Sequence, residues 1–202
     1  MRVLVIYAHP VETSFHAALH RIVVDRLRQA GHDVDDCDLY AEGFDPVLRE
    51  DEFREYDSDK PADDLRNHVE RLRSAQALLF MFPTWNFGMP AIVKGYLDRV
   101  WKAGVSFELV EGRPHPTLRH ITHLAVITTY GSPWAYNKLF MFEPNKRVFM
   151  RGLAGVLSKR VLKLWLAQYS EDRIDDEKRK AFVKESCDAT AKWAAQPAPD
   201  AR

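Results

Sequence analysis

At 202 residues, the chain is long enough for one sizeable α/β domain and too short for separate cofactor and substrate domains of ordinary size. Lysine plus arginine and aspartate plus glutamate both number 29, so there is no net positive charge to attract nucleic acid or an anionic membrane. No apolar run approaches the roughly 20 residues that span a bilayer, and no signal-peptide cleavage pattern follows the first apolar run. We therefore expect a folded cytoplasmic protein that neither binds nucleic acid nor inserts into a membrane.

Short apolar runs alternate with amphipathic segments along the chain. An unbroken, β-branched run at residues 2–8 is typical of a strand that is buried on both faces of a parallel sheet. Apolar residues then recur every three or four positions from residue 15 to residue 30, and Gly31 follows as a helix stop. The same reasoning predicts four more strands, at 34–39, 77–82, 121–129 and 161–167, and four more helices, at 61–74, 91–103, 145–157 and 175–195.

The remaining segments are predicted to be connections. Residues 41–60 carry Gly43, Pro46 and many charges, which favours a loop with a helical turn near residues 50–56. Five strands that alternate with helices specify a doubly wound α/β fold, with a parallel sheet in the flavodoxin order 2-1-3-4-5 and helices on both faces. We expect one flavodoxin-like domain over residues 1–196, followed by a disordered tail at 197–202.

Hydroxyl groups follow the first predicted strand. Thr13 and Ser14 lie at the start of the first helix, where unpaired N–H groups and the helix dipole attract phosphate, and His9 could add a donor. Ser14 could equally be an ordinary N-cap with no ligand. Since no GxGxxG or GxxxxGK[ST] motif is present, a dinucleotide-binding or P-loop turn is not expected here.

Two further loops follow the third and fourth strands. The loop between Pro83 and Pro90 carries Trp85 and Phe87, which could wall a flat ring or simply cover the end of the sheet. The segment 128–132 offers hydroxyls and a glycine that permits close approach to the backbone. Because the carboxyl ends of parallel strands lie at one edge, these loops are expected to meet beside the switch point of the sheet.

Other polar residues show no catalytic or metal-binding spacing. Cys37 and Cys187 are far apart in sequence, and the histidines form no HExxH pattern, so neither a disulfide nor a metal site is predicted. The charge run at residues 172–180 is expected to be a solvated face.

Four ordered segments resemble one known family. They are YAHPxxxSF at residues 7–15, DLYAxxFDPV at 38–47, FPxWNFGMPAxxKGYLDRV at 82–100 and ITTYGS at 127–132. This set resembles the NAD(P)H:quinone oxidoreductase (DT-diaphorase-like) family of the flavodoxin fold. The resemblance implies a flavoenzyme that transfers hydride in two steps from NAD(P)H to a quinone-like, azo or nitro acceptor, as a homodimer with the flavin at the subunit interface.

The resemblance also assigns roles to residues. It implies that the flavin phosphates are held by His9, Ser14, Phe15 and His16, and the isoalloxazine by Pro83, Thr84, Trp85, Asn86 and Phe87, with Thr128, Thr129 and Gly131 at its other edge. The catalytic candidates are Tyr136, which falls where these reductases place an acceptor-pocket tyrosine, and Tyr130, which replaces a glycine of many relatives.

Two questions stay open at this level. The pair Asn86-Phe87 and residues 103–107 look more like the FMN-dependent azoreductases, so the flavin is either FAD or FMN. A flavin-binding regulatory subunit, similar to the ancillary proteins of potassium-efflux systems, and a flavodoxin-type electron carrier are the alternative functions.

Overall fold

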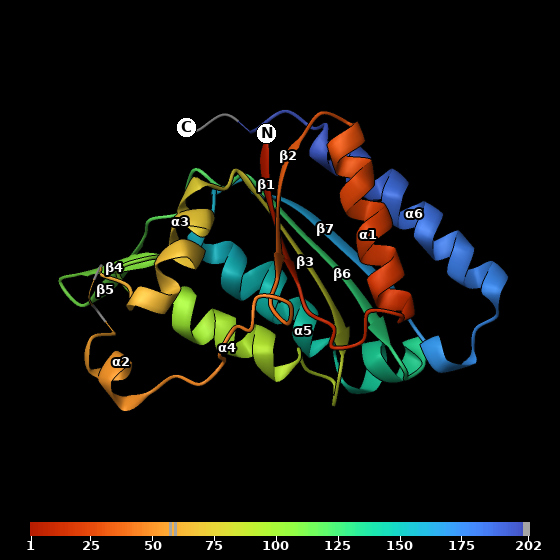
Figure 1. Ribbon diagram of the computed structural model, residues 1–202, viewed down its shortest axis with the longest axis horizontal. Helices are drawn as coiled ribbons and strands as arrows, with labels where there is room; N and C mark the ends of the chain where they lie inside the picture. Colours follow the sequence, from red (N-terminus) through yellow and green to blue (C-terminus); the bar gives the residue numbers. More distant parts are fainter. Residues whose placement is uncertain (57, 59, 200–202) are drawn as a thin grey trace.

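The computed structural model describes residues 1–56, 58 and 60–199, and its centre is a five-stranded parallel sheet. The strand order is β2-β1-β3-β6-β7 (Figure 1), which is the predicted order 2-1-3-4-5. The strands are β1 (Arg2–Tyr7), β2 (Asp33–Asp38), β3 (Ala77–Thr84), β6 (His123–Tyr130) and β7 (Leu162–Gln168). The predicted strands thus all exist, and the flavodoxin-like fold is confirmed.

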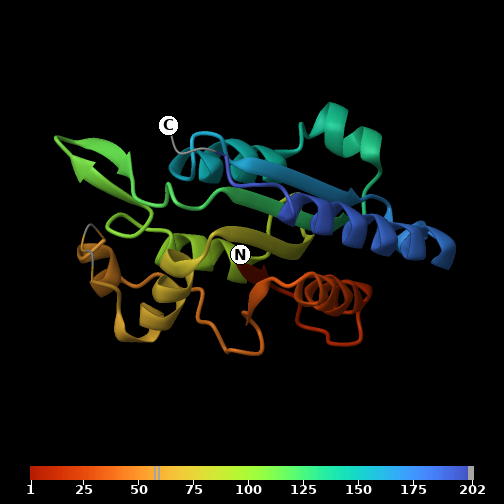
Figure 2. The same ribbon diagram turned by 90° about the horizontal axis from the view of Figure 1, so that it is seen from above.

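Helices cover both faces of this sheet (Figure 2). On one face, α1 (Phe15–Gln29) lies beside α6 (Asp176–Ala194). The other face carries α3 (Arg66–Ser74), α4 (Ala91–Val100) and the segment that begins with α5 (Pro144–Arg147). Among the described residues, no helix is both long enough and apolar enough to cross a membrane.

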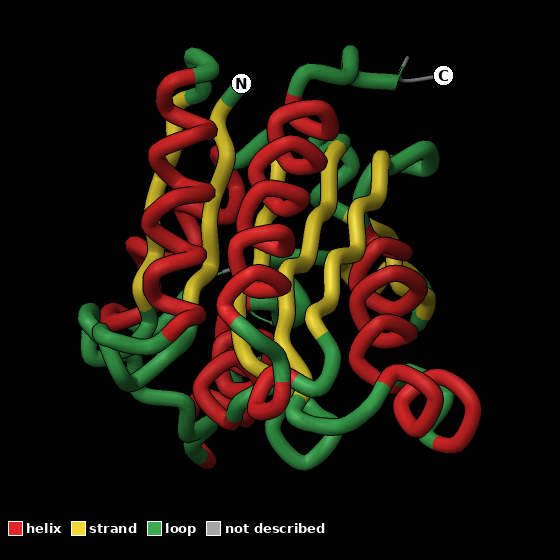
Figure 3. The backbone as a smooth tube through the Cα atoms, turned by 90° about the vertical axis from the view of Figure 1, so that its right-hand side faces the viewer, coloured by secondary structure: helices red, strands yellow, loops and turns green. Residues whose placement is uncertain are grey.

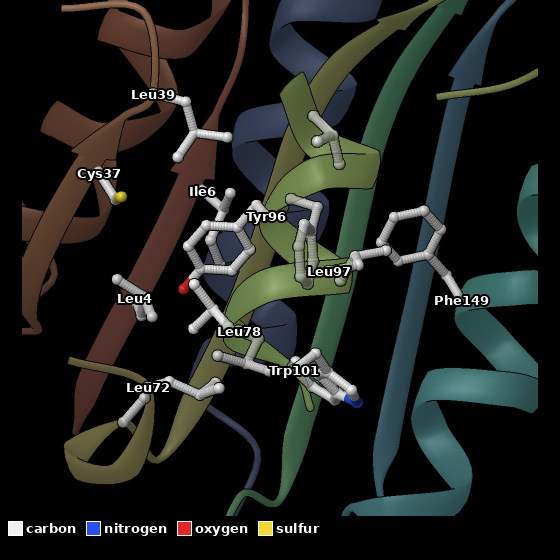
Figure 4. Packing of buried hydrophobic residues seen from close by; sticks show 14 of the residues in the cluster. Leu4, Ile6, Cys37, Leu39, Leu72, Leu78, Tyr96, Leu97, Trp101 and Phe149 are labelled. Carbon is white, nitrogen blue, oxygen red and sulfur yellow. The ribbon is translucent and has the colours of Figure 1, made fainter. Parts of the chain in front are cut away.

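Alternate residues of the central strand β1 point into two separate cores. Val3 and Val5 pack with α1 and α6, whereas Leu4 and Ile6 pack with α3 and α4. Figure 4 shows the second core, in which Tyr96 and Leu97 of α4 lie over β1 and β3. This two-sided burial explains why the strand sequences are unbroken apolar runs.

The strand β3 continues past its predicted end at residue 82. It runs to Thr84 and includes Pro83, although proline lacks the N–H that a sheet ladder uses. Its pairing with β1 ends at Met81, and only β6 pairs beyond that point. Proline is tolerated there because β3 has become an edge strand.

A β-hairpin was missed by the sequence prediction. Strands β4 (Phe107–Val110) and β5 (Arg113–Pro116) pair antiparallel outside the main sheet. Their two-residue turn, Glu111-Gly112, has positive φ at both positions, as a type I′ turn requires. The sequence does not predict this hairpin, because its turn carries glutamate where asparagine or aspartate is usual.

The predicted helix at 145–157 is not one regular helix. It consists of α5, a π-type turn at Val148–Gly152 and a 3₁₀ turn at Leu153–Val156. Gly152 and Gly155 both fall inside this segment, and glycine weakens a regular helix. The predicted helix at 61–74 is likewise split into a 3₁₀ turn at Asp63–Leu65 and α3.

The long connection after β2 is anchored on α4. It contains α2 (Glu50–Arg54), close to the predicted helical turn. A Cβ atom on Gly95 would lie 2.3 Å from Pro46, so the backbone of the connection approaches α4 at a point where only glycine fits. The buried guanidinium of Arg99 completes the anchor, since it donates to Glu52 (2.6 Å), Asp64 (2.7 Å) and the carbonyl of Asp45 (2.6 Å).

The carboxyl ends of the strands all lie at the same edge of the sheet. In Figure 3, the two chain ends lie near the top, and the loops that follow the strands gather at the bottom. Any site built from several of these loops must form at this edge. The predicted tail falls partly on residues 200–202, which lie outside the described residues.

Candidate functional site

A cavity of about 710 Å³ opens at the carboxyl edge of the sheet. It is formed by the loops after β1, β3 and β6, together with the short segment after β7. The residues that line it are His9, Ser14, Phe15, His16, Pro83, Thr84, Trp85, Asn86, Phe87, Thr129, Tyr130, Gly131, Ser132, Glu171 and Asp172. Its volume lies within the range that is usual for cofactor and ligand sites.

Most of the site residues expected from the sequence lie together in this cavity. The exceptions are Thr128 and Tyr136, which are absent from its lining. Thr128 is fully buried behind the wall, where its hydroxyl hydrogen-bonds to Thr84 at 2.9 Å. Tyr136 lies outside on the surface, with its ring centroid 5.5 Å from that of Phe87.

The N-terminus of α1 forms one end of the cavity. Ser14 is its N-cap and accepts a hydrogen bond from the N–H of Ala17 at 3.1 Å. The Ser14 hydroxyl also lies 3.1 Å from Nδ1 of His9, which accepts from the N–H of Val11 at 3.0 Å. With Nδ1 as an acceptor, the neutral His9 ring carries its proton on Nε2, so both side chains can donate to an anion.

His16 is a buried polar side chain without a hydrogen-bond partner among the described residues. It is 3% exposed and lines the cavity, and neither ring nitrogen forms a hydrogen bond within the described part of the chain. Burial lowers its pKa to about 3, and the neighbouring His9 and His20 contribute in the same direction. The ring is therefore neutral near pH 7 and retains both a donor and an acceptor.

A tight turn carries the aromatic wall. Two reciprocal hydrogen bonds join Trp85 and Gly88, at 3.0 Å and 2.9 Å. The central residues Asn86 and Phe87 both have positive φ, at 49° and 61°, so this is a two-residue turn of the type I′ kind. A bulky aromatic residue is rare in this conformation, and its occurrence here indicates a functional constraint.

Behind the turn, polar groups fix the ends of β3 and β6. The Thr84 hydroxyl accepts from the amide of Asn145 at 3.2 Å and is hydrogen-bonded to the Thr128 hydroxyl at 2.9 Å. Tyr130 is buried and stacks on Tyr169 with ring centroids 5.0 Å apart. Burial raises the pKa of Tyr130 to about 12, so its phenol stays protonated near pH 7.

The acidic side of the cavity was not predicted. Glu171 and Asp172 come from the segment after β7, where residues 172–180 were expected to be a solvated face. A Cβ atom on Gly131 would lie 2.7 Å from Oδ2 of Asp172, so glycine allows this contact across the cavity. Glu171 uses one oxygen for Arg179 at 2.9 Å, and the other has no partner among the described residues.

An exposed apolar patch lies next to the aromatic wall. Tyr136 packs against Phe87 and against Phe140, whose ring centroid is 5.0 Å away. The patch, which we call the aromatic patch, consists of exposed residues of the segment after β6: Trp134, Tyr136, Leu139, Phe140, Phe142 and Val148. Clustered exposed side chains of this kind mark interaction surfaces.

The cavity combines features suited to a phosphorylated aromatic ligand. Its helix N-terminus and hydroxyl donors suit a phosphate. Its aromatic wall suits a flat ring. Its carboxylates can accept hydrogen bonds from hydroxyl groups of such a ligand.

Comparison with known proteins assigns the chain to a family. The model of the flavodoxin-like fold family matches residues 1–188. This chain belongs to that family. The match spans all five strands of the sheet and every loop of the cavity in this flavodoxin-like protein.

Sequence relatives of this flavodoxin-like protein include named dehydrogenases. A ribosyldihydronicotinamide dehydrogenase-like protein of Penicillium crustosum is 35% identical over 127 residues, which is 55% of this chain and 48% of that protein. The human ribosyldihydronicotinamide dehydrogenase [quinone] is 29% identical over 154 residues, with 68% of this chain and 67% of that protein covered. The chain thus spans only about half the length of the fungal relative that it matches.

A solved structure extends the likeness to the whole fold. The FMN-dependent NADH-azoreductase of Bacillus anthracis, solved in complex with FMN, has a TM-score of 0.72 and 16% identity. The superposition covers 95% of this chain and 98% of the azoreductase. At this identity the likeness shows a shared fold.

Proposed function

We propose that this protein is a flavin-dependent NAD(P)H oxidoreductase that reduces quinone-like acceptors. The observation that carries the proposal is the meeting of three loops in one cavity, whose lining combines a capped helix N-terminus with an aromatic turn. Relatives that are named as nicotinamide and quinone dehydrogenases support the choice of substrates.

The residues of the cavity fit a flavin, either FMN or FAD. Among the described residues that line the cavity, His16 offers ring nitrogens and Glu171 offers a carboxylate oxygen without hydrogen-bond partners. Buried polar atoms without partners are rare unless a ligand or water satisfies them. When bound, a flavin supplies the chemistry of accepting and donating hydride.

The protein's own contribution is binding and orientation. Ser14, His9 and the first N–H groups of α1 would hold the phosphate, while Trp85 and Phe87 would flank the ring. The N–H groups of Asn86 and Phe87 take no part in the turn's own two hydrogen bonds and can donate to polar atoms of the ring. Because the same open face must serve NAD(P)H and then the acceptor, we infer that the two substrates bind in turn.

A homodimer is part of this proposal. The aromatic patch adjoins the open side of the cavity through the contact between Tyr136 and Phe87. A second copy seated on this patch would cover the exposed rings and would close the cavity against water. Analytical ultracentrifugation of the wild-type protein and of Phe140→Asp tests this: we expect a dimer and a monomer, respectively, and a monomeric wild type would contradict it.

The proposed activity is tested by reconstitution. The purified protein is incubated separately with FMN and with FAD, and the bound flavin is measured by its visible absorbance. Anaerobic NADPH or NADH should bleach this absorbance, and menadione should restore it. The flavin that binds more tightly identifies the cofactor.

Other outcomes of this experiment point to other functions. If neither flavin binds, the proposal fails at its first step. If flavin binds but neither nicotinamide reduces it, the protein acts as an electron carrier or as a flavin-binding regulatory subunit instead.

Ser14→Ala is expected to weaken flavin binding by about tenfold or more, because a hydrogen bond to a charged group contributes about 1.5–3 kcal/mol. The variant also loses the N-cap of α1. Asp175→Ala is the matched control, since Asp175 caps α6 by accepting from the N–H of Lys178 but does not line the cavity. Equal flavin affinity in the two variants, measured by fluorescence quenching, would show that Ser14 is only a cap.

Phe87→Gly is expected to raise the free energy of unfolding by up to about 1 kcal/mol and to weaken flavin binding. Glycine adopts the left-handed conformation without strain and creates an Asn-Gly turn, but it removes the aromatic wall. Glu111→Asn in the β4–β5 turn is the control, because it relieves a positive φ far from the cavity lining. Thermal melts and flavin titrations of both variants should show stabilisation in each, and loss of flavin only in Phe87→Gly.

A further inference from the structure

A thiol, an imidazole and a carboxylate come together away from the cavity. Cys37 lies on β2, Glu42 lies in the turn that follows β2, and His68 lies in the first turn of α3. One ligand atom from each of these three residues lies within 4.8 Å of the others. This cluster could not be predicted from the sequence, because its members follow no metal-binding spacing.

The distance between the thiol and the imidazole of this cluster is close to that around a small tetrahedral ion. Sγ of Cys37 is 3.7 Å from Oε2 of Glu42 and 3.7 Å from Nδ1 of His68. A zinc ion with sulfur at about 2.3 Å and nitrogen at about 2.0–2.1 Å holds those two ligand atoms about 3.5 Å apart. The thiol and the imidazole therefore need to move by only a few tenths of an ångström to share an ion. Glu42 approaches the imidazole at Nε2, at 3.8 Å, so its carboxylate must also turn toward Nδ1.

A fourth polar group is buried beside the cluster. Tyr96 of α4 is fully buried, and its hydroxyl has no hydrogen-bond partner among the described residues. Its ring lies edge-on to that of His68, with centroids 5.9 Å apart. Figure 4 shows the hydroxyl directed toward β1 and β2, the side on which Cys37 lies. A buried phenol without a partner is unexplained by packing alone.

The surrounding charges hold the carboxylate in position. Arg71, one turn after His68 on α3, donates to both oxygens of Glu42 at 2.8 Å and 2.9 Å. The positive charge of Arg71 is balanced in turn by Asp35, at 2.7 Å. Hydrogen bonds from a neighbouring side chain to a ligating carboxylate orient the ligands of metal sites. The Glu42 side chain is 30% exposed, which gives an ion a route from solvent.

We propose that Cys37, Glu42 and His68 form a binding site for a zinc-type divalent ion, with the Tyr96 hydroxyl or a water as the fourth ligand. Binding forms three bonds from the ion to S, N and O, and the thiol proton of Cys37 is released to solvent. A thiolate with an imidazole selects zinc over magnesium or calcium, which prefer oxygen ligands alone. The site would fasten the turn after β2 onto α3 and would act on stability rather than on the redox reaction.

Cobalt serves as a spectroscopic probe for this site. The full-length protein is stripped of metal with a chelator, reduced with a thiol-free reductant and titrated with Co²⁺, then with Zn²⁺. We expect an intense near-ultraviolet thiolate-to-cobalt band that saturates at one ion per chain and that Zn²⁺ abolishes. Cys187→Ser, which removes the other cysteine, should retain the band, whereas Cys37→Ser should lose it.

Two more variants keep the test decisive if Cys37→Ser does not fold. His68→Gln and Glu42→Gln, checked by circular dichroism, should each weaken Co²⁺ binding at least tenfold. Zn²⁺ should raise the melting temperature of the wild type and of Cys187→Ser more than that of these variants. No thiolate band in the wild type, or a band that survives in Cys37→Ser, would overturn the proposal.

Discussion

Arg99→Leu is expected to lower the free energy of unfolding by about 3–5 kcal/mol, the usual loss when one partner of a buried ion pair is removed. Arg99 is 3% exposed and is the only described side chain that ties α4 to Glu52, Asp64 and the Asp45 carbonyl together. Leucine fills much of the same space but leaves the Glu52 carboxylate, itself only 14% exposed, without its cation. Urea denaturation monitored by circular dichroism measures the change.

Arg54→Leu is the matched control for this prediction. Arg54 pairs with Glu50 within α2, where both side chains are mostly exposed, so its loss should change the free energy of unfolding by less than about 1 kcal/mol. A loss of the same size in both variants would mean that the Arg99 network contributes no more than an exposed pair.

Tyr136→Phe is expected to reduce turnover of a quinone acceptor about 100-fold while leaving flavin affinity unchanged. This prediction rests on the proposed function, in which the Tyr136 phenol donates a proton or a hydrogen bond to the acceptor, an effect usually worth 10²–10⁴-fold. Phenylalanine keeps the ring that packs on Phe87 and Phe140, so the aromatic patch stays intact. Steady-state kinetics with NADPH and menadione, combined with a flavin titration, separate the two effects.

Tyr40→Phe serves as the control for Tyr136→Phe. Tyr40 is another exposed tyrosine, and it does not line the cavity. Its turnover should equal that of the wild type. If Tyr136→Phe also keeps full turnover, the phenol has no part in the reaction and Tyr136 serves only as an apolar surface.

Tyr136 belongs to the aromatic patch and lies next to Phe87, which lines the cavity. The exposed Tyr136 ring lies 5.5 Å from the Phe87 ring, between centroids. A dimer formed through the aromatic patch would convert this exposed ring into a wall of an enclosed pocket. Exclusion of water in this way strengthens the polar interactions inside a site.

The fold and most of the cavity could be predicted from local sequence. Strands buried on both faces leave unbroken apolar runs, as at β1 and β3, and the helices between them leave three- and four-residue periodicity. Parallel pairing then places every strand's carboxyl end at one edge, so the loops carrying Ser14, Trp85 and Gly131 had to meet.

Which polar side chains from distant segments share a site depends on tertiary packing. Asp172 reaches the cavity because Gly131 leaves room for it, and Cys37 meets His68 because α3 packs beside β2. Neither contact can be predicted from sequence periodicity, since each depends on packing between segments 31 or more residues apart. Local sequence patterns thus predict the order of the sheet and the edge at which the cavity forms, whereas long-range packing brings Asp172 to the cavity and Cys37 to His68.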